Sequence, residues 1–562
     1  TNAYTITIAS GDATGSTAAE FNTINAATSL AVNASAVTGL ASDTVTNIKT
    51  LLTAGNDTAQ FTANSFESLA TAVVSDSTLS GSDLAGAIDQ ANTATSGTGT
   101  VFTISAVGTI TGSEANFTDL LTDEGNSQID ISNQNLTIDS GTLSVANART
   151  LSDTTSGTVT GTITSGTTIA AMLNGSSGLT DGTDAYTITI AAGDEEVTAT
   201  DLTALYGKTS VAVDASAVTQ ITGTVAEANI VYGAGSSEIT GLGNEIVVTT
   251  ESSLTDVTAL NTLDGHTTGT VNTATITSVT GTLAKLLTAY GSNGITGLGN
   301  EAITVSDTSS LAASDLNSLD SKTSGLITLD TSLATLTGTV AELNTAYGSS
   351  GLSIDGDEAI TISDTTVDAE ALNVLNNYTS GVINADALTK LTGALVDVNV
   401  AFAADAADSA NATISGLGAQ DVELTDTNIL AADLDTLNGY TEGNVDATTV
   451  KVIEGTAATL NSVYAGSASS GNGISGLGNE AVTVTDTTAL TAALVTLDGN
   501  TAGIIDASAV NTLSGSVDSA NSVYASNGFT GLGAESVTLS DTSLSDCLLY
   551  TSPSPRDSRK SR

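Results

Sequence analysis

The sequence is poor in several residue types, and each shortage excludes a class of structure or function. Its 562 residues include no Trp, one Cys, one Met, one His and two Pro. Lys and Arg together number 11 against 61 Asp and Glu, so the net charge is −50. A single cysteine cannot form an intrachain disulfide. Nucleic acid is excluded as a partner, because phosphate binding needs clustered Lys and Arg.

Long apolar runs are missing as well. No stretch of about 18 apolar residues occurs, so no membrane insertion is predicted for this segment. The hydrophobic fraction is nevertheless 40%, with Val, Ile and Leu at recurring places, and this argues against a disordered chain. Because the sequence begins with Thr1, we expect the natural protein to start before it.

The last sixteen residues, 547–562, do not fit the rest of the chain. They contain the cysteine (Cys547), both prolines and four of the eleven basic residues. Reverse translation of residues 547–557 gives a string similar to a transposase sequencing adaptor. We therefore predict that residues 547–562 are a disordered artefact on a metagenomic fragment; a natural basic tail is the alternative.

Internal repeats dominate the remaining sequence. A Gly-Leu-Gly-Asn-Glu motif or a variant of it returns every 55–62 residues. Its copies are Gly241–Glu245, Gly297–Glu301, Asp355–Glu358, Gly416–Gln420, Gly476–Glu480 and Gly531–Glu535. The segment Ala3–Ile8 also returns as Ala185–Ile190. We therefore divide the chain into divergent repeats (1–185) and regular repeats (186–546).

Each repeat contains two halves, and each half combines a strand pattern with a helix pattern. Residues 481–486 alternate as a short strand does, and Leu490, Leu494 and Leu497 then have the spacing of one helix face. A turn is expected at 498–500 and a second strand at 503–508. In another copy, Thr339 and Glu342 have the spacing of a capping box, which predicts a helix over 339–347.

A unit of one strand and one helix, about 28 residues long, cannot bury its apolar face alone, whereas stacked units can. The predicted fold is therefore an α/β repeat solenoid with short parallel strands and short helices. An all-β parallel β-helix and a series of separate globular modules are the alternatives. The absence of Pro-rich linkers favours continuous stacking.

Candidate catalytic residues are few. His266 is the single histidine, and other repeats place Lys208, Lys322, Tyr378, Tyr440 and Asn500 at its position. A position that accepts all of these side chains has no specific chemical role, so His266 is interpreted as a solvated turn residue. No catalytic, cofactor or metal-ligating residue is predicted, and the chain is predicted not to be an enzyme.

One aromatic residue recurs in each regular repeat, at the end of a helical apolar face. Stacked coils would align these rings, which could form a binding stripe, but a structural role is favoured because Phe402 lacks the hydroxyl. The six residues are Tyr232, Tyr290, Tyr347, Phe402, Tyr464 and Tyr524.

Asp or Asn follows the strand in almost every half-repeat. Either these side chains cap the turn that leaves each strand, or their stacked carboxylates bind Ca²⁺. The mixture of Asn and Asp favours capping, and calcium stays open as a cofactor. The residues are Asn33, Asp214, Asn272, Asp307, Asp330, Asp364, Asn384, Asp426, Asp446, Asp486, Asp506 and Asp541.

Three phrases carry a family resemblance: residues 213–218 (Val-Asp-Ala-Ser-Ala-Val), 336–342 (Leu-Thr-Gly-Thr-Val-Ala-Glu) and 476–484 (Gly-Leu-Gly-Asn-Glu-Ala-Val-Thr-Val). The chain resembles long Thr/Asp/Gly-rich repeat proteins of bacterial surfaces, most closely over 186–546. The glycine-rich calcium nonapeptide of RTX proteins is absent.

The resemblance implies a secreted or cell-surface stalk or spacer of an adhesin, with surface glycans, other cells or divalent cations as partners. A fibrous phage tail protein is the alternative. A polysaccharide-acting enzyme on a β-helix ranks third, since no repeat departs from the others with its own cluster of carboxylates and basic residues.

Overall fold

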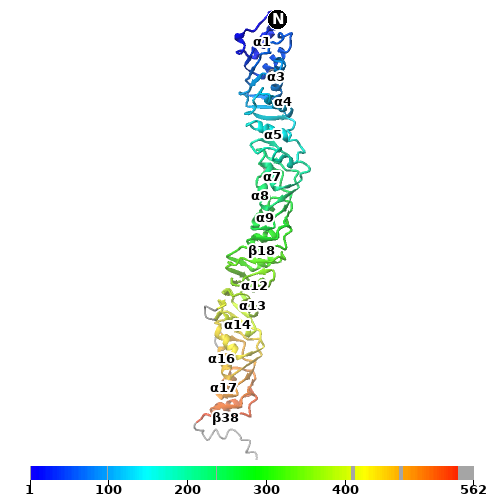
Figure 1. Ribbon diagram of the computed structural model, residues 1–562. Coiled ribbons are helices and arrows are strands. Elements are labelled where there is room, and N and C mark those ends of the chain that lie inside the picture. Colours follow the sequence, from blue (N-terminus) through cyan, green and yellow to red (C-terminus); the bar gives the residue numbers. More distant parts are fainter. Residues whose placement is uncertain (1, 98, 236, 407–411, 468–472, 542–562) are drawn as a thin grey trace, which may run out of the picture. The chain divides into compact units, whose positions relative to one another are not determined.

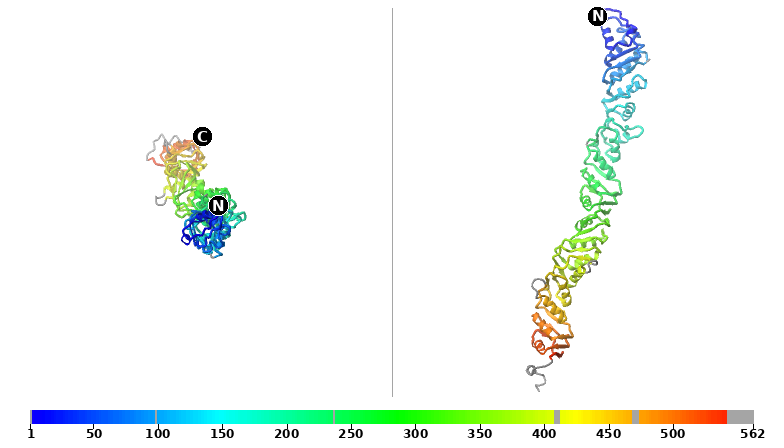
Figure 2. Two further views of the ribbon diagram at one scale, coloured as in Figure 1. Left: turned by 90° about the horizontal axis from the view of Figure 1, so that it is seen from above. Right: turned by 90° about the vertical axis from the view of Figure 1, so that its left-hand side faces the viewer.

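The computed structural model describes residues 2–97, 99–235, 237–406, 412–467 and 473–541. The predicted adaptor-derived tail, 547–562, lies outside these residues. The chain divides into two units: the first comprises residues 1–276 and 292–298, and the second comprises residues 277–291 and 299–562. Figures 1 and 2 show that, within each unit, short helices follow one another in chain order and short strands run beside them.

Each helix packs against the preceding and the following helix of its unit, apart from the weaker contacts around the short α6. In the first unit the helices are α1 (Ala18–Ala27), α2 (Val45–Gly55), α3 (Gly81–Ala94), α4 (Glu114–Gly125), α5 (Val145–Thr154), α6 (Ile169–Met172), α7 (Ala199–Tyr206), α8 (Val225–Gly233) and α9 (Val257–Asp264). In the second they are α10 (Leu283–Gly291), α11 (Ala313–Asp320), α12 (Val340–Gly348), α13 (Ala369–Tyr378), α14 (Leu395–Ala406), α15 (Ala431–Tyr440), α16 (Ala457–Ser467), α17 (Thr491–Asn500) and α18 (Val517–Ala525).

The strands of the first unit pair in parallel. One sheet has, in spatial order, β1 (Gly39–Asp43), β2 (Thr71–Val74) and β4 (Val101–Thr103). A second has β3 (Thr78–Ser80), β5 (Thr109–Ser113), β6 (Asn135–Ser140), β7 (Val159–Thr162) and β8 (Ala185–Thr187). A third has β9 (Glu196–Thr198), β11 (Gln220–Gly223), β13 (Ile246–Thr249), β15 (Val271–Asn272) and β17 (Ile295–Thr296), and a fourth has β10 (Val213–Asp214) and β12 (Ile239–Thr240). Strand β14 (Ser253–Leu254) also lies in this unit.

The second unit repeats the parallel arrangement. Its strands, by sheet, are β16 (Ser278–Gly281), β18 (Ala302–Val305), β20 (Ile327–Leu329), β22 (Leu352–Ser353); β19 (Ser310–Ala312), β21 (Thr335–Gly338), β23 (Ala359–Ile362), β25 (Ile383–Asn384), β27 (Ile414–Ser415); β24 (Thr366–Asp368), β26 (Lys390–Gly393), β28 (Asp421–Leu424), β30 (Val445–Asp446), β32 (Ile474–Ser475); β29 (Asn428–Leu430), β31 (Val452–Gly455), β33 (Ala481–Val484), β35 (Ile505–Asp506), β37 (Phe529–Thr530); and β34 (Thr488–Leu490), β36 (Thr512–Gly515), β38 (Ser536–Leu539).

The predicted α/β repeat architecture is therefore confirmed. The all-β alternative is wrong, because helices recur along both units. One coil, as used below, means one helix with the strands that precede it. Two predicted details differ from the structure. Leu490 does not lie on the helix face, because it ends β34 and is 62% exposed, whereas Leu494 and Leu497 of α17 are fully buried. The predicted turn at 498–500 is the last turn of that helix.

The sheets are staggered relative to the helices. Strand β19 ends directly before α11 begins at Ala313, but β27, the last strand of the same sheet, ends at Ser415, well ahead of α15, which begins at Ala431. Paired strands lie about 4.8 Å apart, whereas packed helices need about 8–10 Å. Both spacings are accommodated because, along each sheet, every further strand lies farther from the start of the following helix. Each sheet therefore ends after a few strands, and another sheet begins.

The core lies between the helices and the strands. The residues that face inward, such as Leu372 and Leu375 of α13 and Ile360 and Ile362 of β23, are almost fully buried. The predicted capping box at Thr339 is present: Thr339 Oγ1 accepts from Glu342 N (3.2 Å), and Glu342 Oε2 accepts from Thr339 N (2.9 Å). None of the described helices is long and apolar enough to span a bilayer.

Candidate functional site

The Gly-Leu-Gly-Asn-Glu motif is a turn closed around its own glutamate. Glu245 is fully buried, and its Oε2 accepts hydrogen bonds from Gly243 N (2.8 Å) and Asn244 N (3.2 Å). Gly241 and Gly243 have φ of 87° and 135°, a region that L side chains rarely adopt, so the turn requires glycine at both positions. The motif is thus a tight bend directly before strand β13.

The recurrent tyrosine completes this site. The Tyr232 hydroxyl, near the end of α8, donates to Glu245 Oε2 over 2.8 Å. The other tyrosines of the set repeat the contact with the glutamate of the following motif. These pairs are Tyr290–Glu301 (2.9 Å), Tyr347–Glu358 (3.2 Å), Tyr464–Glu480 and Tyr524–Glu535 (2.8 Å). In each pair a carboxylate, buried in all but Glu535, thus ties the end of a helix to the turn that starts the next coil.

The repeat with Phe402 departs from this pattern at both partners. Phe402 cannot donate a hydrogen bond, and Gln420 stands in place of the glutamate. Gln420 Oε1 still accepts from Gly418 N (2.7 Å) and Ala419 N (3.0 Å). Its amide nitrogen donates to the carbonyls of Leu388 and Gly416 (3.1 and 2.7 Å). The two changes compensate: without a hydroxyl donor, the amide retains the turn and carries no buried charge.

Electrostatics keep the proton on the tyrosine. Burial, followed by the hydrogen bond to Glu245 and its charge, raises the pKa of Tyr232 well above its ordinary range. Burial and the contact with Glu535 raise the pKa of Tyr524 to about 12. Burial acts to raise the pKa of Glu535, but hydrogen bonds from Gly533 N and the Tyr524 hydroxyl outweigh it and leave a net lowering. The tyrosine therefore acts as the donor and the glutamate as the acceptor, and the pair fixes the turn.

His266 lies where the sequence placed it, exposed just after α9. Its ring stacks on Tyr232 with centroids 5.6 Å apart and 9° between planes. Two equivalent residues do the same: Tyr378 stacks on Tyr347 (5.9 Å) and Tyr440 on Phe402 (6.4 Å). The sequence analysis did not predict these stacks; the signal for them is that the same repeats have a ring at both positions.

The twelve Asp and Asn residues that follow strands fall into two groups. In the first, the side chain accepts a hydrogen bond from the backbone N–H two residues later, as in Asp214–Ser216 (3.0 Å) and Asp506–Ser508 (2.9 Å). The capping interpretation is confirmed for this group. Its members are Asn33, Asp214, Asn272, Asp330, Asn384, Asp446 and Asp506.

The second group caps a helix of the preceding coil, which the sequence did not predict. Asp364 Oδ2 accepts from Val340 N, the first residue of α12, over 2.8 Å. A negative charge at a helix N-terminus also stabilises the helix dipole. The group comprises Asp307, Asp364, Asp426, Asp486 and Asp541. In the first unit, Asp43, Asp76, Asp194 and Glu251 act in the same way.

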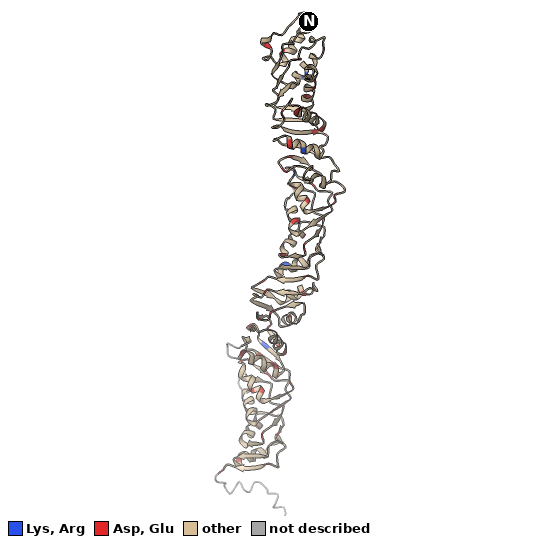
Figure 3. Ribbon diagram, in the orientation of Figure 1, with Lys and Arg blue, Asp and Glu red and all other residues tan. Residues whose placement is uncertain are grey.

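Acidic side chains are scattered along both units, with few Lys or Arg among them (Figure 3). No group of three or more His, Cys, Asp or Glu in the described part of the chain is arranged to hold a metal ion. No protein-family model matches the sequence, and no curated protein matches it significantly.

Proposed function

We propose that this chain is a structural repeat segment of a secreted or cell-surface bacterial protein, and that it acts as an adhesive stalk or spacer rather than as an enzyme. The observation that carries the proposal is the regular way in which neighbouring coils are fixed to one another, because the same contacts return from repeat to repeat. A spacer needs such uniformity, because every junction between coils must hold.

Three contacts recur at these junctions in the second unit. Two of them return once per repeat, at every second helix: the Asp cap from the following coil and the Tyr–Glu pair, which Phe402 and Gln420 replace in one repeat. The third is an Asn in mid-helix whose Nδ2 donates to a backbone carbonyl of the next helix, as in Asn344 to Ala371 (3.0 Å) and Asn373 to Asp397 (2.9 Å). When each coil contacts only its neighbours, stability is approximately a sum of coil and junction energies. Length can then change by whole repeats without a change in fold.

Deletion of one complete repeat tests the proposal. Removal of residues 313–368 joins Ala312, at the end of β19, to Ala369, the first residue of α13, so equivalent positions meet. We expect this variant to fold with unchanged unfolding cooperativity and with a smaller maximum dimension in solution scattering.

The matched control removes residues 313–353, which joins β19 to Ile354, where no helix begins. We expect this deletion to expose the apolar faces of the adjacent coils and to lower their protection from hydrogen exchange. If both deletions are tolerated equally, or if the in-phase deletion unfolds the second unit, the stalk proposal is wrong.

A further inference from the structure

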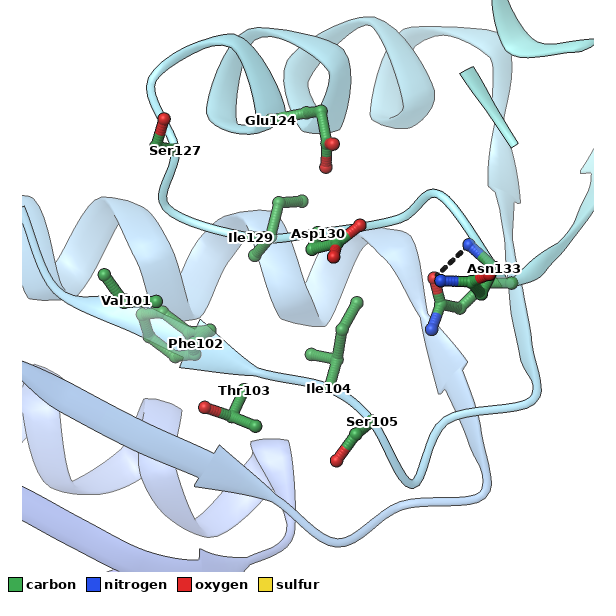
Figure 4. A pocket seen from close by; sticks show the side chains of 11 residues that line it. Val101, Phe102, Thr103, Ile104, Ser105, Glu124, Ser127, Ile129, Asp130 and Asn133 are labelled. Carbon is green, nitrogen blue, oxygen red and sulfur yellow. Dashed lines mark hydrogen bonds between the residues drawn. The ribbon is translucent and has the colours of Figure 1, made fainter. Parts of the chain in front are cut away.

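A cavity of about 560 Å³ lies beside strand β4 in the first unit (Figure 4). One wall is the segment from Val101 to Ser105. The other is formed by Glu124 near the end of α4 and by five residues that follow this helix: Ser127, Ile129, Asp130, Asn133 and Gln134. This volume is in the range of small-molecule binding pockets.

The cavity exists because the strand ladder is interrupted. In regular coils, the residue after the strand donates its N–H to the next coil, as Ala215 does to Thr240 O (2.8 Å) and Ala385 to Ser415 O (2.8 Å). Ile104 occupies this position after β4. Phe102 N does bond Gln128 O (2.7 Å), but among the described residues nothing accepts a hydrogen bond from Ile104 N. Strand β4 is accordingly the last strand of its sheet.

Glu124 accounts for the interruption. Its Oε2 accepts from Ile131 N over 2.7 Å and so holds the next coil toward the end of α4 instead of against β4. The carboxylate of Asp130 is fixed in turn, because its Oδ1 accepts from Ser132 N (3.0 Å). Each of these two carboxylates has one oxygen occupied by the loop. Among the described residues none donates to the other oxygen, which can accept a hydrogen bond from a ligand.

The chemistry of the lining selects the ligand. No Lys, Arg or His lines the cavity, so an anion would meet only Glu124 and Asp130. A cationic amine would satisfy the carboxylates but leave the Ile104 N–H without an acceptor, which is costly for a buried backbone group. A neutral polyhydroxylated molecule both donates and accepts. Val101, 45% exposed at the strand, offers apolar surface to the C–H groups of a sugar ring.

We propose that this cavity binds a neutral saccharide unit, with the carboxylates of Glu124 and Asp130 as acceptors for its hydroxyls and Ile104 N–H as a donor to one of its oxygens. The proposal is independent of the stalk function, since a chain that binds no sugar could still pass the deletion test.

The test uses the full chain and ligand-observed saturation-transfer NMR. The probes are the methyl glycosides of glucose, galactose, mannose and xylose, with putrescine as the cationic comparison. We expect at least one glycoside to bind with a Kd of about 1–10 mM, as is reasonable for about a dozen heavy atoms in an open pocket. Binding of putrescine without any glycoside, or no binding at all, would overturn the proposal.

Two variants localise the site. Glu124→Gln and Asp130→Asn each keep an oxygen that can accept from Ile131 N or Ser132 N, so the loop should stay in place, which circular dichroism checks. Each should weaken glycoside binding at least tenfold. The control is Asp330→Asn, which alters the same kind of turn (Asp330 Oδ1 to Ser332 N, 2.9 Å) in the second unit and should leave binding unchanged. Unchanged binding in both cavity variants would show that the sugar binds elsewhere and refute the proposal.

Discussion

The first 185 residues and the regular repeats form similar coils, but different contacts hold each helix against the neighbouring turn. These contacts are called the lock below. Five fully buried phenylalanines lie in the first region: Phe21, Phe61, Phe66, Phe102 and Phe117. Phe66 contacts two of them, with ring centroids 6.4 Å from Phe21 and 5.1 Å from Phe61. The regular repeats instead have cores mainly of Leu, Ile, Val and Ala, and five of the six pair a tyrosine with a glutamate, whereas the sixth has Phe402 and Gln420.

The features that both regions share define the coil itself. Cross-coil carboxylate caps occur in both: Asp43 bonds Ala19 N (2.6 Å) in the first region, and Asp486 bonds Ala457 N (2.6 Å) in the regular repeats. Both regions also have parallel strands and helices with an apolar inner face. The cap and the apolar pattern therefore specify the coil, while the lock between helix and turn can be an aromatic cluster or a buried hydrogen-bonded pair.

The largest effect is expected in the aromatic region. Phe66→Ala removes a ring that touches both Phe21 and Phe61, and it should cost about 3–5 kcal/mol of local stability through lost burial and a residual cavity. Hydrogen exchange of α1 and α2 should report the loss. Phe66→Leu, which keeps most of the volume, should cost much less. A loss under about 1 kcal/mol for the alanine variant would show that the cluster is not what locks these coils.

The Tyr–Glu lock gives the next largest effect, and the natural Phe402–Gln420 repeat supplies the design. Tyr347→Phe and Glu358→Gln each break one side of a pair and should each cost about 1–2 kcal/mol, because a polar group loses its partner. The double variant reproduces the natural alternative and should cost less than the sum of the two, with a coupling energy of about 1 kcal/mol. Urea unfolding of the four proteins measures this. Strict additivity would mean that the paired exchange in the Phe402 repeat is coincidental.

The cross-coil cap is expected to contribute less, because the helix has a second cap. Asp364→Ala removes the acceptor for Val340 N, while Thr339 and Glu342 continue to cap α12. We expect a loss of about 1 kcal/mol, measured by denaturant unfolding and by exchange of the α12 amides. Asp364→Asn, which retains an acceptor without the charge, should lose about half of this. An alanine variant as stable as the parent would contradict the prediction and show that the cap does not contribute to stability.

Much of the fold could be predicted from local sequence. Thr339 and Glu342 identified a helix start because both partners of a capping box lie within four residues. Leu490 was misplaced because its spacing to Leu494 suits a helix, but the strand β34 extends up to the helix and leaves Leu490 exposed. The stagger of the sheets could not be predicted, since it arises from the different spacings of packed helices and paired strands, which no single repeat contains.

The contacts that matter most for the site were hidden for a related reason. Tyr347 and Glu358 lie on opposite sides of a turn, and only the folded coil brings them together. Considered by itself, the absent hydroxyl of Phe402 favours a structural role for the ring and gives no sign of a hydrogen bond. A comparison with Gln420 at the matching motif position would have indicated the pair, because both partners change in the same repeat.

The smallest effect is expected at His266. Its ring stacks on Tyr232, but the residue is exposed, and equivalent repeats place Lys322 or Asn500 there without a ring. His266→Ala should therefore change stability by less than about 0.5 kcal/mol, as for most surface substitutions. Thermal unfolding monitored by circular dichroism measures it. Tyr232→Ala is the informative control, since it removes both the stack and the hydrogen bond to Glu245 and should cost several times more. A His266→Ala loss comparable to that of Tyr232→Ala would place the stack, rather than the buried pair, at the centre of the lock in the regular repeats.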